Sequence, residues 1–317
     1  MENNEKVVLF THGIDIDGYG CAVLARLAFD DVKIFFADNF GLDSEFINAL
    51  REGKLSDCDR IFITDHCPTE ELCASINRRP ALRDKTIVLD HHISRIDLPS
   101  KFSWVTVVDQ NKQGKCSGTS LFFEHLLKNG CFSQLGMRSK LLLADMVELT
   151  RQYDTWDWTK TNNVRAKDLN TLAMAIGRED YVNRMVENIE MGIPYLFSHQ
   201  DIYDIDSYEK AFNQKLEMYL NKISVVDFQG VKAGYVEIED RFKNDIAESV
   251  RKSPLSKKIE VLLMPIEDRG TVSLRSVDPN FDCAALAEAN DGGGHKAAAS
   301  FPLRKLKKDF LKTRREI

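Results

Sequence analysis

The chain has 317 residues, 43% of them hydrophobic and 29% charged, a composition typical of a folded globular protein with room for two domains. Its formal net charge of −6 at pH 7 argues against a broad electrostatic footprint for long duplex nucleic acid. The start MENNEKVVLFTHG lacks the pattern of a signal peptide, no apolar run is long enough to span a membrane, and the cysteines form no C-x-x-C pair. We therefore expect a cytoplasmic protein with reduced thiols and no membrane partner.

The first half of the chain alternates apolar runs with helical patterns. Strands are expected at residues 6–10, 32–37, 60–65, 85–90 and 104–109, and helices at 20–29 and 44–53, the second capped by Ser44. Strands that alternate with helices predict a parallel α/β sheet. The runs show no polar alternation, which is typical of strands covered on both faces.

From Gly118 the pattern becomes helical, with one helix ending at Gly130, a second over 138–153 and a long connecting helix over 207–223. A hairpin with Gly230 near its turn, a helix and two paired strands follow, which predicts a smaller α/β domain with a mixed sheet. We expect a catalytic domain at 1–200, a helical linker at 201–222 and a substrate-binding domain at 223–317.

Acidic and imidazole side chains follow three of the predicted strands. They are His12, Asp15 and Asp17 after the first strand, Asp65 after the third, and Asp90, His91 and His92 after the fourth. Ligands of open parallel sheets bind beyond the carboxyl ends of the strands, so we expect these groups to meet. Such a cluster would raise its own carboxylate pKa values unless a cation neutralised it.

The ligand types indicate which cation this would be. Asp15 and Asp17 alternate, so in an extended loop their carboxylates would point to opposite sides, an arrangement that suits two metal ions flanking a shared ligand. Carboxylate and imidazole ligands without thiolate fit Mn²⁺, Mg²⁺ or Fe²⁺ better than structural zinc.

Four motifs carry a family resemblance. In order and spacing, DIDG (15–18), ITDH (63–66), LDHH (89–92) and GGGH (292–295) resemble the DHH phosphoesterase family with its DHH-associated C-terminal domain, and within it the oligoribonucleases or nanoRNases. The resemblance covers nearly the whole chain. It implies two Mn²⁺ ions, with Mg²⁺ as the alternative.

The resemblance also implies a role for each position. His12 and Asp15 would hold one ion, Asp17 and His91 the other, Asp65 would bridge them, and Asp154 would be a late ligand, with Asp145 as the alternative. His92 would face the substrate phosphate, and Asp90 would fix an imidazole, a role that general metal-site chemistry also favours. The usual family spacing between the histidine and the first aspartate differs, which leaves His12 open between a metal ligand and a loop histidine bonded to the backbone.

The second domain carries the remaining candidates. Consecutive glycines let backbone N–H groups approach an oxyanion closely, and by resemblance Gly292, Gly293, Gly294 and His295 form a nucleotide-binding loop. Arg275 in SLRS would grip a terminal phosphate. The alternative for GGGH is a flexible turn, and the alternative for Arg275 is an exposed strand arginine. The helix start at 117–120 is either a phosphate site or a cap, and Trp156, Trp158 and Tyr153 either stack on bases or pack in the core.

The resemblance implies a metal-dependent phosphodiesterase that hydrolyses short RNA or DNA oligonucleotides to 5′-mononucleotides through water activated by two metals. The substrate would lie between the domains, with its far end at Arg275 and His295. Phosphatase activity on 3′-phosphoadenosine 5′-phosphate could accompany it. The alternatives are a cyclic-dinucleotide phosphodiesterase and a non-catalytic metal-dependent nucleotide-binding protein. Exposed sheet edges could pair two copies as a homodimer.

Overall fold

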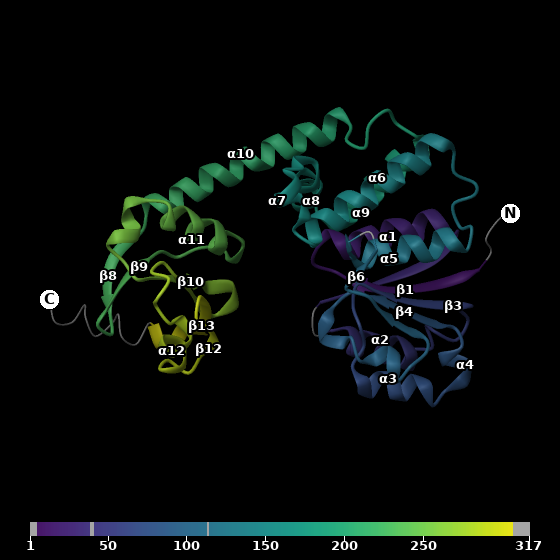
Figure 1. Cartoon of the computed structure of the whole chain (residues 1–317), viewed down its shortest axis with the longest axis horizontal. Helices are drawn as coiled ribbons and strands as arrows, with labels where there is room; N and C mark the ends of the chain where they lie inside the picture. Colours follow the sequence, from purple (N-terminus) through teal and green to yellow (C-terminus); the bar gives the residue numbers. More distant parts are fainter. Residues whose placement is uncertain (1–4, 39–40, 113, 307–317) are drawn as a thin grey trace. The chain divides into compact units, whose positions relative to one another are not determined.

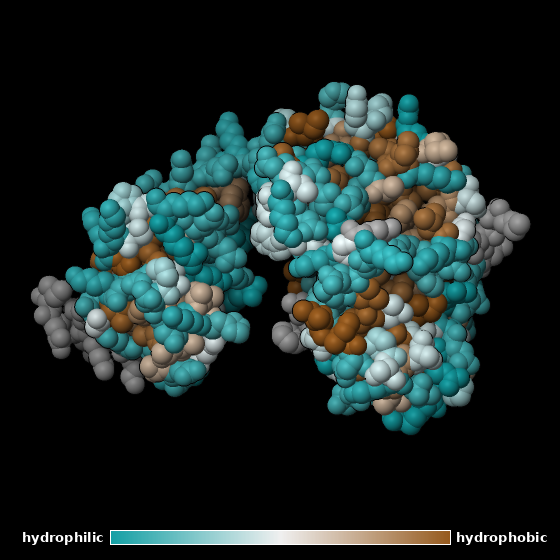
Figure 2. Space-filling view, in the orientation of Figure 1, coloured by the Kyte–Doolittle hydropathy of each residue, from teal (hydrophilic) through white to brown (hydrophobic). Residues whose placement is uncertain are grey.

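The computed structural model describes residues 5–38, 41–112 and 114–306, and the chain divides into two compact units, Met1–Tyr208 and Glu209–Ile317. Helix α10 (His199–Asn221) begins in the first unit and ends in the second, so the predicted connecting helix starts earlier than expected. Within the described ranges, none of the helices is long and apolar enough to cross a membrane. Figure 2 shows hydrophilic residues over most of the visible surface, with hydrophobic residues in separate patches.

The first unit is built on a parallel sheet, as the sequence predicts. Its strand order is β2-β1-β3-β4-β5, and every neighbouring pair is parallel. The strands are β1 (Lys6–His12), β2 (Asp31–Ala37), β3 (Arg60–Thr64), β4 (Thr86–Asp90) and β5 (Val105–Val107). A short hairpin of β6 (Gln110–Asn111) and β7 (Gly114–Lys115) follows.

Helices cover both faces of this sheet (Figure 1). One face carries α1 (Ile16–Ala28), α5 (Gly118–Lys128), α6 (Met137–Asp154), α8 (Val164–Ile176) and α9 (Arg178–Met191), with α7 (Asp157–Thr161) beyond α6; the other carries α2 (Leu42–Arg51), α3 (Glu70–Asn77) and α4 (Pro80–Arg83). Along β1, Val7 and Leu9 pack into the core on one face, whereas Val8 and Phe10 pack into the core on the other. Both faces are therefore apolar, which explains the unbroken hydrophobic runs.

The starts of two helices differ from the sequence prediction. Asp15 caps α1, and its Oδ1 accepts a hydrogen bond from the Gly18 N–H at 3.3 Å. Asp17 therefore lies in the first helical turn, and the prediction of an extended loop holding Asp15 and Asp17 is wrong, because an aspartate before a helix satisfies its free N–H groups. Ser44 is likewise not a cap, since α2 begins at Leu42 after Gly41.

The second unit contains a six-stranded mixed sheet of order β12-β13-β11-β10-β9-β8, in which only β9 and β10 pair in parallel. The elements are β8 (Ser224–Phe228), β9 (Val231–Tyr235), α11 (Lys243–Arg251), β10 (Val261–Ile266), β11 (Thr271–Ser276), α12 (Cys283–Glu288), β12 (Gly293–His295) and β13 (Ala298–Pro302). The hairpin of β8 and β9 turns at Gln229 and Gly230, both with positive φ, which agrees with the expected glycine turn.

Gly293 and Gly294 lie in the edge strand β12, which Gly292 directly precedes, and this corrects the prediction of a loop. A Cβ at Gly292 would lie 2.1 Å from the Ser300 carbonyl oxygen, and one at Gly294 would lie 2.5 Å from the Ala299 Cα. These two glycines are needed because the strand lies too close to β13 for side chains. A Cβ at Gly293 would meet no atom within 4 Å.

Candidate metal centre

Adjacent strands bring the predicted ligands to one edge of the parallel sheet. His12 is the last residue of β1, Asp65 directly follows β3, and Asp90 ends β4 before His91. Strands β1, β3 and β4 are consecutive neighbours in the sheet, so their carboxyl ends meet.

A first group of side chains surrounds His12. Its Nδ1 lies 2.8 Å from Asp15 Oδ2 and 3.8 Å from Asp65 Oδ2. One ligand atom from each of these three residues lies within 4.8 Å of the others. His12 is therefore a neighbour of two carboxylates inside the cluster.

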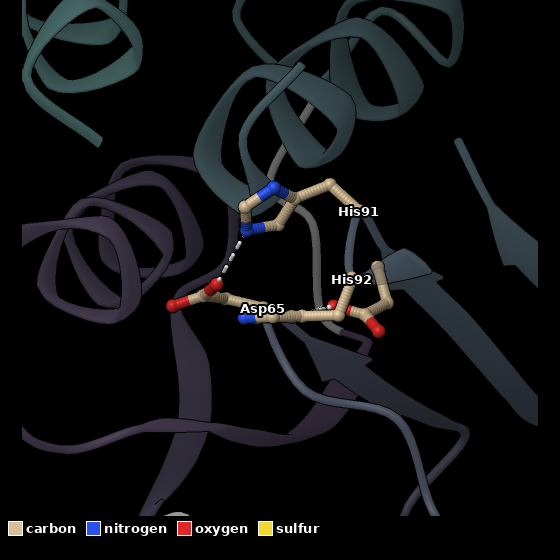
Figure 3. Close-up of side chains that lie close together, drawn as sticks. Asp65, His91 and His92 are labelled. Carbon is tan, nitrogen blue, oxygen red and sulfur yellow. Dashed lines mark hydrogen bonds and ion pairs between the residues drawn. The ribbon is translucent and has the colours of Figure 1, made fainter. Parts of the chain in front are cut away.

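A second group surrounds His91. Its Nε2 lies 3.3 Å from Asp65 Oδ1, 3.6 Å from Asp17 Oδ2 and 3.7 Å from Asp154 Oδ2. Figure 3 shows the His91 ring directed at the Asp65 carboxylate. Since Asp65 contacts both His12 and His91, it joins the two groups.

The two candidates for the late ligand have different surroundings. Asp154 is the last residue of α6 and reaches His91, as described above. Asp145 lies within the same helix and accepts a hydrogen bond from Arg165 Nη1 at 3.1 Å. The structure therefore brings Asp154 into the cluster and gives Asp145 a cationic partner outside it.

The N-terminus of α5 positions the Asp17 carboxylate. The N–H of Gly118 donates to Asp17 Oδ2 at 2.6 Å, and the N–H of Thr119 donates to Oδ1 at 2.9 Å. Ser117 and Ser120 form a capping box at the same helix start. Of the two interpretations of this segment, the cap therefore agrees with the structure, and the positive end of the helix stabilises the Asp17 carboxylate.

Asp65 has an unusual backbone conformation, with φ of 52°, in the left-handed region. The chain there runs against α5, where a Cβ on Gly118 would lie 2.4 Å from the Asp65 Cβ. Only glycine fits at position 118, and this close approach holds Asp65 between the two groups.

Negative charge is in excess within this cluster. Burial, reinforced by the carboxylates of Asp17 and Asp15, raises the pKa of Asp65 well above its usual value. The same causes raise the pKa of Asp154 to about 8. Burial also acts to raise the pKa of Asp15, but the His12 hydrogen bond and the Gly18 N–H outweigh it and lower that pKa. A bound cation would remove the repulsion.

Partnerless polar atoms indicate the same requirement. Asp65 Oδ2, Asp90 Oδ2 and His91 Nε2 are buried and have no hydrogen-bond partner in the part of the chain that the structure describes. Buried polar atoms of this kind are costly unless something binds them. Carboxylate oxygens and imidazole nitrogens are common protein ligands of divalent metal ions, so the residues present fit such ions.

His92 is held by Asp90 at the rim of the cluster. The His92 Nδ1 lies 2.7 Å from Asp90 Oδ1, and this hydrogen bond raises the pKa of His92 despite partial burial. Asp90 is fully buried, whereas 49% of the His92 side chain is exposed. The pair therefore places an oriented imidazole at the surface of the site.

His66 is a neighbour of the cluster that the predicted site omits. Its ring stacks on His12 with 5.9 Å between the centroids, and burial lowers its pKa. The signal that could have found it is its position in the ITDH motif, directly after Asp65.

In the second unit, strand register aligns Arg275 and His295. Ala298 pairs with Arg275 on one side and with His295 on the other. Directly paired residues share one face of a sheet, so both side chains lie on the face of Ala298, with Cα atoms about 9.5 Å apart. The Arg275 guanidinium donates to Ser273 Oγ at 3.0 Å and to Asn244 Oδ1 at 3.2 Å. These bonds fix its orientation.

Fold and site together describe a two-unit α/β protein with a cluster of carboxylate and imidazole groups that could hold divalent metal ions. No family model matches the chain. Its sequence is 28% identical over 301 residues to the oligoribonuclease NrnB of Bacillus subtilis, covering 92% of this chain and 71% of that protein. It is also 28% identical over 155 residues to a 3′,5′-cyclic-nucleotide phosphodiesterase of Helicobacter pylori, covering 45% of this chain and 42% of that protein.

Two solved structures share the fold. The DHH domain of a member of the s1p family of ribosomal proteins gives a TM-score of 0.57 at 16% identity, covering 97% of this chain and 87% of that one. A pGpG-specific phosphodiesterase from Vibrio cholerae gives 0.52 at 15% identity, covering 98% of each chain. With the ordered motifs and the similarity to NrnB, these findings support the resemblance of the chain to the DHH family of phosphoesterases.

Proposed function

We propose that this protein is a metal-dependent phosphodiesterase that hydrolyses short oligonucleotides to 5′-mononucleotides. The observation that carries the proposal is the joining of two ligand groups by Asp65 at one sheet edge. Two-metal sites of this general kind act on phosphate esters. The similarity to an oligoribonuclease over 92% of the chain supports short oligonucleotides as the substrate class.

Two divalent ions, Mn²⁺ or alternatively Mg²⁺, would be held by the two groups, with Asp65 shared between them. His12 and Asp15 would serve one ion, and Asp17, His91 and Asp154 the other. When bound, such ions lower the pKa of water and stabilise charge on phosphate oxygens. The N–H groups of α5 keep the Asp17 carboxylate in one orientation before any ion binds.

His92 would contact the substrate phosphate. Its Nδ1 faces Asp90, so the proton on this nitrogen is held by the buried carboxylate and Nε2 is the nitrogen left for substrate. The hydrogen bond to Asp90 raises the pKa of His92 and so favours the charged ring more than in a free histidine. A charged imidazole can donate a hydrogen bond to a phosphate oxygen as negative charge develops there.

The residues of the second unit would form a nucleotide-binding surface. Arg275 presents a planar guanidinium that suits a phosphate, and His295 adds an imidazole on the same face of the sheet. Gly293, where no atom lies within 4 Å of a Cβ position, leaves the surface beside them open. These features support a nucleotide-binding role for GGGH and Arg275.

A substrate panel tests the proposal. Purified protein with Mn²⁺ would be incubated with RNA and DNA of two to five nucleotides, longer RNA, 3′-phosphoadenosine 5′-phosphate and pyrophosphate. We expect the highest kcat/KM on the shortest oligonucleotides, a loss of at least 100-fold in Asp17→Ala and His91→Ala, and little change in Asp145→Ala. Full activity in the first two variants contradicts the assignment, and fewer than two bound Mn²⁺ ions per chain favours the non-catalytic alternative.

A second candidate is hydrolysis of cyclic nucleotides or cyclic dinucleotides. It is favoured by the similarity over 155 residues to a cyclic-nucleotide phosphodiesterase. Adding 3′,5′-cyclic AMP and cyclic dinucleotides to the same panel separates the candidates, because the preferred substrate is the one with the highest kcat/KM.

A further inference from the structure

Trp156 lies beside the metal centre in an exposed position. It follows Asp154 by two residues, and 67% of its surface is exposed. Its backbone φ is 61°, in the left-handed region that large residues rarely adopt. A large apolar side chain held in this conformation and facing water is unfavourable for folding, which points to a function outside the core.

The turn that carries Trp156 is held from both sides. The Trp156 N–H donates to the Tyr153 carbonyl oxygen at 3.2 Å, and its carbonyl oxygen accepts the Thr159 hydroxyl at 2.8 Å. Arg151 Nη1 then donates to Asp157 Oδ2 at 3.0 Å in the following helical turn. The backbone of Trp156 is therefore fixed, and its ring is presented from a rigid segment.

The neighbouring tryptophan has a different environment. Trp158 packs against the core of the first unit, and its ring stacks on Tyr153 with 6.2 Å between centroids and 13° between planes. The Trp156 ring lies 6.4 Å from the Trp158 ring, 28° from parallel. Of the two interpretations of this aromatic cluster, core packing therefore applies to Trp158 and Tyr153, and Trp156 is left for another partner.

A cavity of about 400 Å³ joins Trp156 to the metal ligands. His91, His92 and Asp154 line it together with Trp156 and the exposed Ile93. Lys115 also contributes to the lining and adds positive charge. Polar ligands beside apolar side chains match the two parts of a nucleotide, a charged phosphate and an aromatic base.

We propose that Trp156 stacks on the nucleobase next to the phosphate held at the metal centre. This rests on the proposed function, since it takes an oligonucleotide as substrate, and it names a base-binding residue within the first unit. Stacking on an aromatic side chain suits every base, so Trp156 would favour nucleotides over other phosphate esters without selecting a sequence.

The test compares substrates with and without the base. An RNA dinucleotide and the same compound with an abasic ribose would be assayed with wild type, Trp156→Phe and Trp156→Gly. Glycine accepts the φ at this position, so the last variant is expected to fold. In wild type the two KM values should differ about 5- to 150-fold. Trp156→Gly should reduce this ratio towards one, and Trp156→Phe should retain most of it.

Fluorescence provides a readout that needs no turnover. Binding of 5′-AMP should quench part of the tryptophan emission, ribose 5-phosphate should not, and Trp156→Gly should lose that quenching. Tyr203→Gly, which removes another aromatic side chain with 67% exposure in the first unit, is the matched control and should retain it.

The outcomes separate the two proposals. If wild type cleaves dinucleotides and Trp156→Gly keeps both the KM ratio and the quenching, stacking is wrong and the proposed function stands. If wild type cleaves no oligonucleotide, the proposed function fails, and quenching by 5′-AMP that depends on Trp156 still supports a base site.

Discussion

Replacing Asp65 by asparagine should stabilise the metal-free protein while removing its response to metal. Asp65 is 2% exposed, and burial together with Asp17 and Asp15 raises its pKa well above the usual value near 3.8. Asparagine has the same shape, tolerates the left-handed φ of 52° and carries no charge. The substitution therefore removes a buried carboxyl group whose ionisation the fold opposes.

The sign of the pH dependence follows from the raised pKa. Below about pH 4 the carboxyl group is protonated in both the folded and the unfolded protein, so wild type and variant should be similar. As the pH rises towards the folded pKa, the unfolded chain releases this proton more readily than the folded one, and wild type loses stability. Asp154, with a folded pKa of about 8, acts in the same direction.

At pH 8 the free energy of unfolding of the metal-free variant should exceed that of wild type by about 1–3 kcal/mol, the usual range for a substitution at a buried unfavourable group. For a unit the size of Met1–Tyr208 this corresponds to about 2–4 °C in Tm for each kcal/mol. The assay is thermal unfolding in chelator at pH 5 and pH 8, repeated with Mn²⁺. Saturating Mn²⁺ at 100 times Kd should stabilise wild type by about 2.7 kcal/mol and the variant by much less.

Asp145→Asn is the matched control, because it removes a carboxylate that already has Arg165 as a partner. It should be slightly destabilising at both pH values and should keep the full response to Mn²⁺. The reasoning would be refuted if Asp65→Asn lowered the metal-free Tm equally at pH 5 and pH 8, or if Mn²⁺ stabilised it as much as wild type.

Three further predictions concern the supports of the site. Gly118→Ala places a Cβ 2.4 Å from the Asp65 Cβ. It should therefore lower the free energy of unfolding, measured in urea, by about 1–3 kcal/mol and weaken Mn²⁺ binding. The control is Gly136→Ala, where a Cβ meets no atom within 4 Å. Asp90→Asn replaces the carboxylate that raises the pKa of His92 by a neutral amide, so the alkaline limb of the kcat/KM profile should move to lower pH, and an unchanged profile argues against a charged His92. Asp154→Asn should weaken Mn²⁺ binding about 10-fold or more by calorimetry, whereas equal affinity in this variant and wild type would exclude Asp154 as a ligand.

The amino-acid sequence by itself determined the class of fold and which residue types are available at the candidate site. Unbroken apolar runs such as the one at 6–10 predict strands covered on both faces, and the structure has β1 with a core on each side. The ordered DIDG, ITDH, LDHH and GGGH motifs indicate the resemblance to DHH phosphoesterases, because their residue types and spacing lie in the chain itself. These features depend on neighbours close in sequence, so periodicity and motifs are sufficient to find them.

Only the tertiary structure decided how the ligands are held. The Asp17 carboxylate receives N–H groups from Gly118 and Thr119, and the first of these lies 101 positions away along the chain. Tertiary packing also decided that part of GGGH is an edge strand, because β13 pairs with it. It likewise left Trp156 exposed while Trp158 packs against the core. Local pattern cannot predict these outcomes, because packing between distant segments decides which surfaces are buried and which backbone groups find partners.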